Sequence, residues 1–176
     1  MKSVLISIQR PHTDNIKALI KKIEVRKNKP NQETPFPCFI YETKTKGGCG
    51  KVIGELVCDE VYEWKYDYCD GVDIDDDLIL DTCLDREDIN IYAKGKTLYG
   101  WHISDLKIYD KPKELSEFKT GCKGCKERDT YHCKFYCCSE RPLTRPPQSW
   151  CYVEEFVCGP DCETHHDRDI NAAKIF

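Results

Sequence analysis

Apolar residues along this chain fall into short runs that are typical of β-strands. Residues 2–8 (Lys-Ser-Val-Leu-Ile-Ser-Ile) are almost continuously apolar, which predicts a buried first strand. Further strands are predicted over 23–26, 38–42, 52–62 and 101–109. Within 52–62 the alternation predicts that Ile53 and Val57 face one way and that Leu56 and Cys58 face the other. Pro112 is expected to end the last of these strands.

One amphipathic helix is expected after the first strand. Pro11 suits the first turn of a helix, because its missing N–H would have no partner there. Apolar residues then recur at i, i+3, i+4 and i+7, at Ile16, Leu19, Ile20 and Ile23. This pattern predicts a helix with one buried face that ends near Lys21 and Lys22.

The acidic stretch 67–88 is expected to form a surface loop with one or two short helices, anchored by Ile74, Leu78 and Leu80. Since strands outnumber helices, the sequence predicts an α+β protein built on a small mixed β-barrel with flanking helices. A Cys-rich insert over 119–140 and a short tail are expected in addition.

Composition narrows the class of protein. The 176 residues are 40% hydrophobic, and no apolar run approaches the length of a membrane span. No secretory signal follows Met1, so the expected location is the cytosol, with no membrane partner. The net charge of −4 hides an uneven distribution: residues 1–30 carry +6 and residues 59–90 carry −11. A mildly acidic chain can therefore still present a basic face to a polyanion.

Thirteen cysteines are the strongest compositional signal, and eight of them lie within 122–162. In a reducing compartment, clustered cysteines more often bind a metal than form disulfides. The predicted ligands of a structural zinc are Cys122, Cys125, Cys133 and Cys137, with Cys138 or His132 as alternatives. Four protein ligands would leave no open position for water. Without the metal, this lysine-rich loop has little apolar surface to hold its shape.

Five short motifs, in this order, resemble an ASCH domain of the type that phages and prophages encode. They are Leu5-Ile6-Ser7-Ile8 before a helix, Lys21-Lys22-Ile23-Glu24-Val25-Arg26-Lys27, Val52-Ile53-Gly54-Glu55, Tyr99-Gly100-Trp101-His102-Ile103 and Pro146-Pro147-Gln148-Ser149-Trp150. The resemblance spans about residues 1–155. It implies a PUA-like barrel of five or six strands, a cleft beside the first helix, and a role in binding or processing RNA.

The residues within these motifs suit RNA or a modified nucleoside as ligand. Cations near the end of the helix would neutralise phosphates, and indole rings would stack on an unpaired base. The expected contact residues are Lys21, Lys22, Arg26, Lys27, Trp101, Gln148, Ser149 and Trp150. Ordinary core packing is the alternative for both tryptophans.

The resemblance also raises the question of catalysis. Some small family members hydrolyse the amide of N4-acetylcytidine with a lysine near the helix end and a threonine three positions later, and other relatives are reported as ribonucleases. Lys21 matches that lysine, but Glu24 stands where the threonine would be. A small amidohydrolase or ribonuclease that uses Lys21 and Glu24 is therefore an alternative to pure RNA binding.

The tail, 156–176, carries a second resemblance. Residues 162–174 resemble the C-terminal end of OrfB-type transposases, in which Asp169 would match an aspartate of a metal-dependent nuclease site. One carboxylate cannot hold the two ions that such nucleases need, so the resemblance implies a transposon-derived fragment or fusion remnant. A nucleic-acid-binding role of this end is a further alternative. A second zinc set there would be Cys158, Cys162, His165 and His166.

Overall fold

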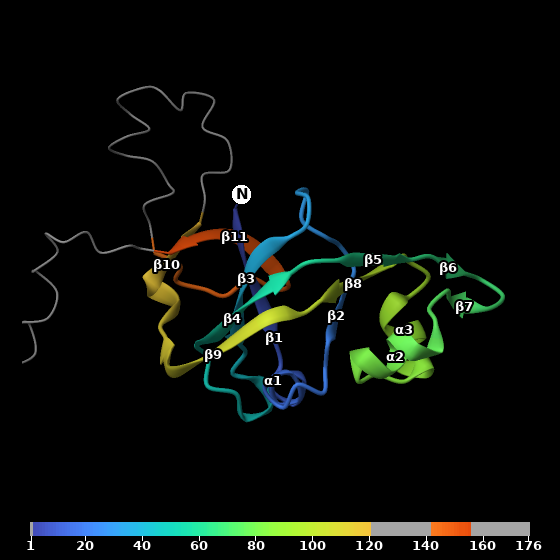
Figure 1. The fold of residues 1–176 in the computed structure, drawn as a ribbon, viewed down its shortest axis with the longest axis horizontal. Helices are drawn as coiled ribbons and strands as arrows, with labels where there is room; N and C mark the ends of the chain where they lie inside the picture. The colour runs from blue at the N-terminus through green and yellow to red at the C-terminus, as the bar shows by residue number, and fades with distance from the viewer. Residues whose placement is uncertain (1, 121–141, 156–176) are drawn as a thin grey trace, which may run out of the picture.

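Six strands form the larger sheet of the computed structural model, which describes residues 2–120 and 142–155 (Figure 1). Across the sheet they are β10 (Phe118–Thr120), β11 (Trp150–Glu155), β1 (Ser3–Ile8), β3 (Phe36–Glu42), β4 (Val52–Cys58) and β9 (Ser104–Lys113). β1 and β3 are parallel and the other neighbours antiparallel. Because β1 pairs with β11, the chain after residue 142 completes the sheet beside the first strand.

A smaller sheet lies beside the larger one. It contains β2 (Ile23–Arg26), β8 (Leu98–His102) and β5 (Val61–Trp64), all antiparallel. Next to it are the hairpin β6 (Tyr66–Asp67) and β7 (Gly71–Val72) and the helices α2 (Asp76–Thr82) and α3 (Arg86–Ala93) (Figure 1). Helix α1 (Arg10–Lys17) and the 3-10 turns η1 (Thr45–Gly47) and η2 (Leu115–Glu117) complete the elements.

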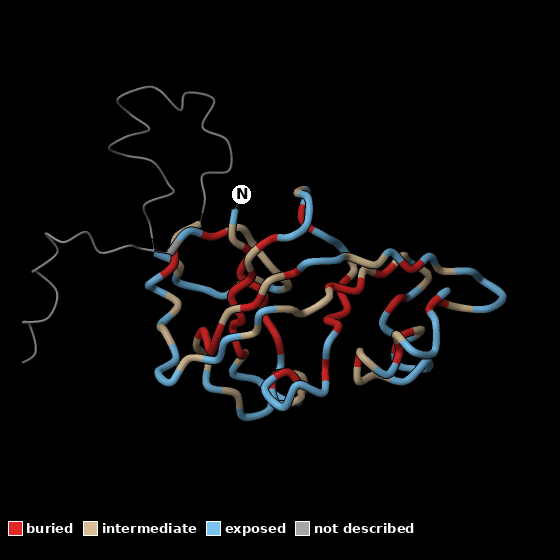
Figure 2. The backbone as a smooth tube through the Cα atoms, viewed as in Figure 1, coloured by how far each residue is buried: buried red, intermediate tan, exposed pale blue. Residues whose placement is uncertain are grey.

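Three apolar clusters hold these layers together. One packs β1 and α1 against β3, β4 and Trp101, and another packs β2 and β8 against α2 and α3. The third cluster lies on the other face of the large sheet, around Leu5 and Phe118. Figure 2 shows the buried residues concentrated along the strands at the centre of the molecule.

The mixed α+β class is confirmed, but two predicted strands are each divided. Residues 52–62 form β4 in the large sheet and β5 in the small one, and residues 101–109 are likewise shared between β8 and β9. Asp105, the second residue of β9, has a positive φ of 45° just after the second transition. The described strands therefore form separate sheets and no closed barrel.

One predicted strand face and one predicted strand end also need correction. Ile53 packs in the same cluster as Leu56 and Cys58, because the pairing of β4 with β9 shifts register near Val52. Pro112 does not end its strand, which continues to Lys113. The strand concerned, β9, is at the edge of the sheet, where a proline is tolerated.

The helix in the structure is shorter than the helix that the apolar pattern predicted. α1 ends at Lys17, and Leu19 then adopts a left-handed conformation with φ 59°. Leu19 and Ile20 are 69% and 60% exposed, so of the predicted face only Ile16 is buried within α1. Similarly, in the acidic stretch Leu80 is 75% exposed and the neighbouring Ile79 is buried instead.

The first two residues of the predicted insert, Lys119 and Thr120, belong to β10 and pair with β11. All predicted zinc ligands lie outside the described residues. They are Cys122, Cys125, His132, Cys133, Cys137, Cys138, Cys158, Cys162, His165 and His166. Among the helices that the structure describes, none combines the length and apolarity needed to cross a membrane.

Candidate functional site

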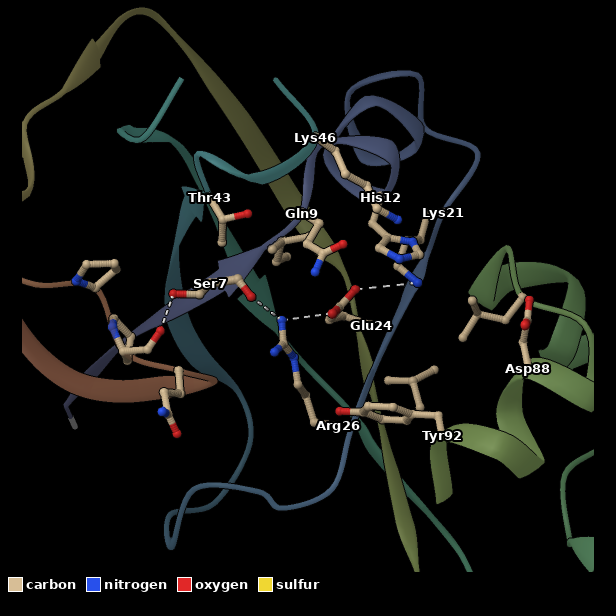
Figure 3. A pocket seen from close by; sticks show the side chains of 16 residues that line it. Ser7, Gln9, His12, Lys21, Glu24, Arg26, Thr43, Lys46, Asp88 and Tyr92 are labelled. Atoms are coloured by element: carbon tan, nitrogen blue, oxygen red, sulfur yellow. Dashed lines mark hydrogen bonds and ion pairs between the residues drawn. The ribbon is translucent and has the colours of Figure 1, made fainter. Parts of the chain in front are cut away.

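An open cleft of about 780 Å³ lies where β1, α1 and β2 meet (Figure 3). The end of β1 and the start of α1 form one wall, and α3 forms the opposite side with Asp88 and Tyr92. The segment 146–148, just before β11, closes a further side. Residues far apart in the sequence therefore line one concave surface.

A buried carboxylate lies between two cations in this cleft. In β2, Glu24 and Arg26 are two residues apart and so share one face of the strand. Glu24 Oε1 is 2.8 Å from Arg26 Nη2, and Glu24 Oε2 is 3.4 Å from Lys21 Nζ. Each of the three residues is at most 8% exposed. The result is a charged cluster with one positive charge in excess, the Lys21–Glu24–Arg26 cluster.

The turn that ends α1 brings Lys21 into this cluster. The amides of Ile20 and Lys21 both donate to the carbonyl of Asn15, so the chain folds back beneath the helix. The Lys21 amino group also donates to the carbonyl of Thr82, at the end of α2. Since helix carbonyls carry partial negative charge at that end, this is a favourable place for a cation.

The charges in the cluster control the ionisation of Glu24. Burial raises the pKa of this carboxyl group, but Lys21 and Arg26 lower it by more, so that its pKa lies below the usual value. Glu24 is therefore ionised at neutral pH and holds both cations in place.

Hydrogen bonds from β1 attach the segment before β11 to the cluster. Arg26 Nη2 donates to the Ser7 carbonyl at 2.7 Å, and Arg26 Nη1 donates to Ser149 Oγ at 3.4 Å. Ser7 Oγ in turn donates to the carbonyl of Pro147 at 2.7 Å, and the Ser7 amide donates to the Ser149 carbonyl. The position of this cleft wall thus depends on the same arginine that Glu24 orients.

The structure brings together several of the predicted site residues. Lys21, Glu24, Arg26 and Gln148 line the cleft, and Ser149 contacts Arg26. Gln148 is exposed and lies on the rim.

Two predicted cations lie apart from these residues. The Lys22 amino group pairs with Asp81 at 3.0 Å and does not line this cleft. Lys27 does not line the cleft either. Its amino group lies 4.7 Å from the centre of the ring of Tyr92, and Tyr92 does line the cleft.

Neither of the two tryptophans that were predicted to stack on a base lines the cleft. Trp101 is 2% exposed and packs edge-on against Phe36, with ring centres 5.6 Å apart. Its burial leaves no ring face for a base, which corrects the stacking role predicted from the sequence. Trp150 is partly buried against Trp101 and Tyr152 and does not line the cleft.

Three residues that sequence reasoning missed also line the cleft: His12, Lys46 and Tyr92. Of the three, only His12 could have been placed from the sequence, since it directly follows Pro11 at the start of the predicted helix. Burial lowers the pKa of His12. The charge of Glu24 raises this pKa, but the positive charges of Lys21, Lys46 and Arg26 lower it, and the net shift is downward. The imidazole is therefore neutral at neutral pH. Burial raises the pKa of Tyr92, which keeps its hydroxyl protonated.

Within residues 2–120 and 142–155, no group of three or more histidine, cysteine or acidic side chains is arranged to hold a metal ion. The prediction of zinc therefore concerns only residues outside the described part of the chain.

Solved structures of an ASCH protein from Zymomonas mobilis have a similar fold. The native protein matches with a TM-score of 0.58 and 16% identity, over 87% of this chain and 88% of the other. Two of its single-residue mutants match with TM-scores of 0.57 and 14% identity, over 88% and 87% of this chain and 91% and 89% of theirs. The chain has an ASCH-type fold. No protein-family model and no curated protein sequence matches it.

This likeness supports the ASCH-type fold that the five sequence motifs predicted, whereas the barrel that the resemblance implied is not closed in the described strands. At such low identity it establishes the fold alone. The phage or prophage type and the transposase-like tail remain predictions.

Proposed function

We propose that this ASCH-type domain binds RNA in the cleft beside α1. The observation that carries the proposal is the meeting of Lys21, Arg26 and Gln148 on one open concave surface. A charged cluster with one excess positive charge favours an anionic ligand, and the cleft is large enough for a nucleotide.

The structure suggests how the contacts are divided. Lys46 is exposed on the rim and Lys27 lies beside Tyr92, so these two cations would contact phosphates. Gln148 would hydrogen-bond a base edge, because its amide both donates and accepts. Tyr92, whose ring lines the cleft and is 37% exposed, would take the stacking role that was predicted for tryptophan.

The proposal is tested with a fluorescent single-stranded RNA and the full chain, by anisotropy at several salt concentrations. Lys46→Ala is expected to weaken binding and to reduce the slope of log K against log salt by about 0.7, the value for one phosphate contact on a single strand. Lys111→Ala, on the exposed edge strand β9, is the control and is expected to change neither quantity. If Lys46→Ala and Gln148→Ala both bind like the wild type, the cleft is not the RNA site.

A hydrolase acting in the same cleft is the second candidate. Both oxygens of Glu24 are already in ion pairs and the Lys21 amino group already donates to Thr82, so these residues suit charge stabilisation better than proton transfer. A neutral His12 nearby is the observation that favours chemistry. For an amidohydrolase, turnover of N4-acetylcytidine must fall in Lys21→Ala; unchanged turnover refutes the role of that lysine.

A structural zinc at Cys122, Cys125, Cys133 and Cys137 is also part of the proposal, supported by the cysteine spacing alone. Metal analysis of protein purified without added zinc is expected to give stoichiometric zinc. Cys122→Ser should lower the content, whereas Cys69→Ser, a free and exposed thiol, should not. Absence of stoichiometric zinc in the wild type contradicts the site.

The transposase-like end gives a third candidate, in which residues 156–176 supply the nucleic-acid contacts. Removing them should leave RNA affinity unchanged if the cleft is the site. Loss of binding on their removal would favour the third candidate.

A further inference from the structure

Asp88 lines the cleft, and the proposed binding of RNA does not use it. Its side chain projects from α3 on the side opposite β1 and α1 (Figure 3). Asp88 is exposed, and within residues 2–120 and 142–155 no hydrogen bond or ion pair engages its carboxylate. Glu24, the other acidic residue among the described ones that line the cleft, has both oxygens in ion pairs. Of these two carboxylates, Asp88 is therefore the one that can accept hydrogen bonds from a ligand.

Helix α3 places Asp88 beside the residue that was proposed to stack on a base. Asp88 and Tyr92 are four residues apart in this helix, so they share one face, with about 5–6 Å between their Cβ atoms. Both line the cleft. The Lys27 amino group lies over one face of the Tyr92 ring, which leaves the other face for a base. A base that stacks there has one edge within reach of the Asp88 carboxylate.

The charge of Asp88 decides which part of an RNA it contacts. A carboxylate repels phosphates and only accepts hydrogen bonds, so it suits a base edge that presents N–H groups. Among the four RNA bases, only guanine presents two adjacent donors, N1–H and the N2 amino group. Adenine and cytosine present one amino group beside a ring nitrogen that accepts, and uracil presents one N–H between two carbonyl groups. The two oxygens of a carboxylate therefore match guanine best.

We infer that α3 carries a subsite for guanine, in which Tyr92 stacks on the base and Asp88 accepts hydrogen bonds from N1–H and from the N2 amino group. This inference rests on the proposed binding of RNA and names the base that the cleft selects. Hydrogen bonds to a carboxylate are charge-assisted and stronger than neutral ones. A paired contact of this kind discriminates against a wrong base by about 5- to 150-fold.

A purely structural role of Asp88 is separable from this one. Asp88 lies in the first turn of α3, where a negative charge interacts favourably with the helix dipole. Glu87 lies in the same turn and is also exposed, but it does not line the cleft. Glu87→Gln thus removes the same charge from the same turn without changing the subsite, and it is the matched control for Asp88→Asn.

The experiment measures binding of the full chain to labelled oligouridylates that carry one variable base at the centre, by fluorescence anisotropy. The wild type is expected to bind the guanine oligonucleotide at least about fivefold more tightly than those with adenine, cytosine or uracil. Inosine lacks the N2 amino group and should lose most of this preference. The base 7-deazaguanine keeps both donors and should retain the preference.

The two variants separate base selection from charge. Asp88→Asn should reduce the preference for guanine to about twofold or less, because an amide has a single acceptor oxygen. Its affinity for the all-uracil oligonucleotide should not fall, since the loss of a negative charge favours phosphates. Glu87→Gln should keep the wild-type preference. Thermal melting shows that each variant is folded.

The possible failures are distinguishable. Equal affinity of the wild type for all four bases, a preference for another base, or equal binding of inosine and guanine overturns the inference. It is also overturned if Asp88→Asn keeps the preference for guanine, or if Glu87→Gln loses it to the same extent as Asp88→Asn. Each of these results leaves the binding proposal intact. Failure of the wild type to bind any of these RNAs refutes the binding proposal itself.

Discussion

Replacing Glu24 with glutamine removes the negative charge that lies between the Lys21 ammonium and the Arg26 guanidinium. The amide keeps the shape of the side chain, so the change isolates the charge. Lys21 is 3% exposed and Arg26 is 7% exposed, which means that water cannot replace the lost carboxylate. Two buried cations would then repel each other without a counter-charge.

The magnitude follows from this burial. Removing one partner from a buried ion pair typically costs about 3–5 kcal/mol, mainly because the remaining charge is left uncompensated. For a chain of this length, 1 kcal/mol corresponds to about 2–4 °C in Tm. Glu24→Gln is therefore expected to lower Tm by at least about 6 °C.

Urea unfolding followed by tryptophan fluorescence measures the effect, since Trp101 is buried in the core. Glu63→Gln is the matched control: it breaks an ion pair with Lys29 in which both side chains are about half exposed, at 3.5 Å. Such exposed pairs contribute about 0–1 kcal/mol. If Glu24→Gln costs no more than Glu63→Gln, the Lys21–Glu24–Arg26 cluster is not held by its buried charge, and the reasoning about the cleft is wrong.

Two further predictions concern the fold. Burial raises the pKa of Glu42, but hydrogen bonds from Thr13 and the Cys49 amide lower it by more, to about 2. The stabilisation that ionised Glu42 contributes is therefore present above pH 4.5 and lost as pH falls towards 2. Glu42→Gln should cost at most about 3 kcal/mol of unfolding free energy at pH 7. If the variant is still less stable than the wild type by the same amount at pH 2, this reasoning is wrong. Trp101→Ala is expected to cost about 3–5 kcal/mol in urea unfolding, whereas an unchanged stability with weaker RNA binding would restore the stacking role.

The sequence predicted the strands better than it predicted where they end. Apolar runs mark 52–62 and 101–109 correctly as extended chain, but a run carries no signal for a passage from one sheet to another. The helix was extended too far for a similar reason. Leu19 and Ile20 continue the 3.6-residue spacing past Lys17, although the chain there turns back to place Lys21 against Thr82, and only that tertiary contact explains the turn.

For the candidate site too, local sequence patterns pointed to some of the residues, whereas tertiary packing decided the others. The sequence predicted the strand 23–26, and in β2 this places Glu24 and Arg26 on one face. It also named Gln148 as a contact residue, and Gln148 lines the cleft. The burial of Trp101 was not predictable, because an indole in a β-strand suits a core and a binding surface equally well. Tyr92 was missed because it lies in an acidic helix whose packing against the cleft depends on β2 and β8.

The described residues on either side of 121–141 meet at β10, and the chain after them leads to the cleft. Lys119 and Pro142 form a β-bridge, and the Leu143 amide donates to the Phe118 carbonyl, so both flanks of the segment are held together at β10. A few residues further on, the chain reaches Pro147, whose carbonyl is fixed by Ser7. The wall of the cleft that carries Gln148 is thus anchored at both ends, by β10 and by β1. This anchoring explains how a part of the chain more than 120 residues from Arg26 reaches it in a defined position, which local sequence patterns cannot encode.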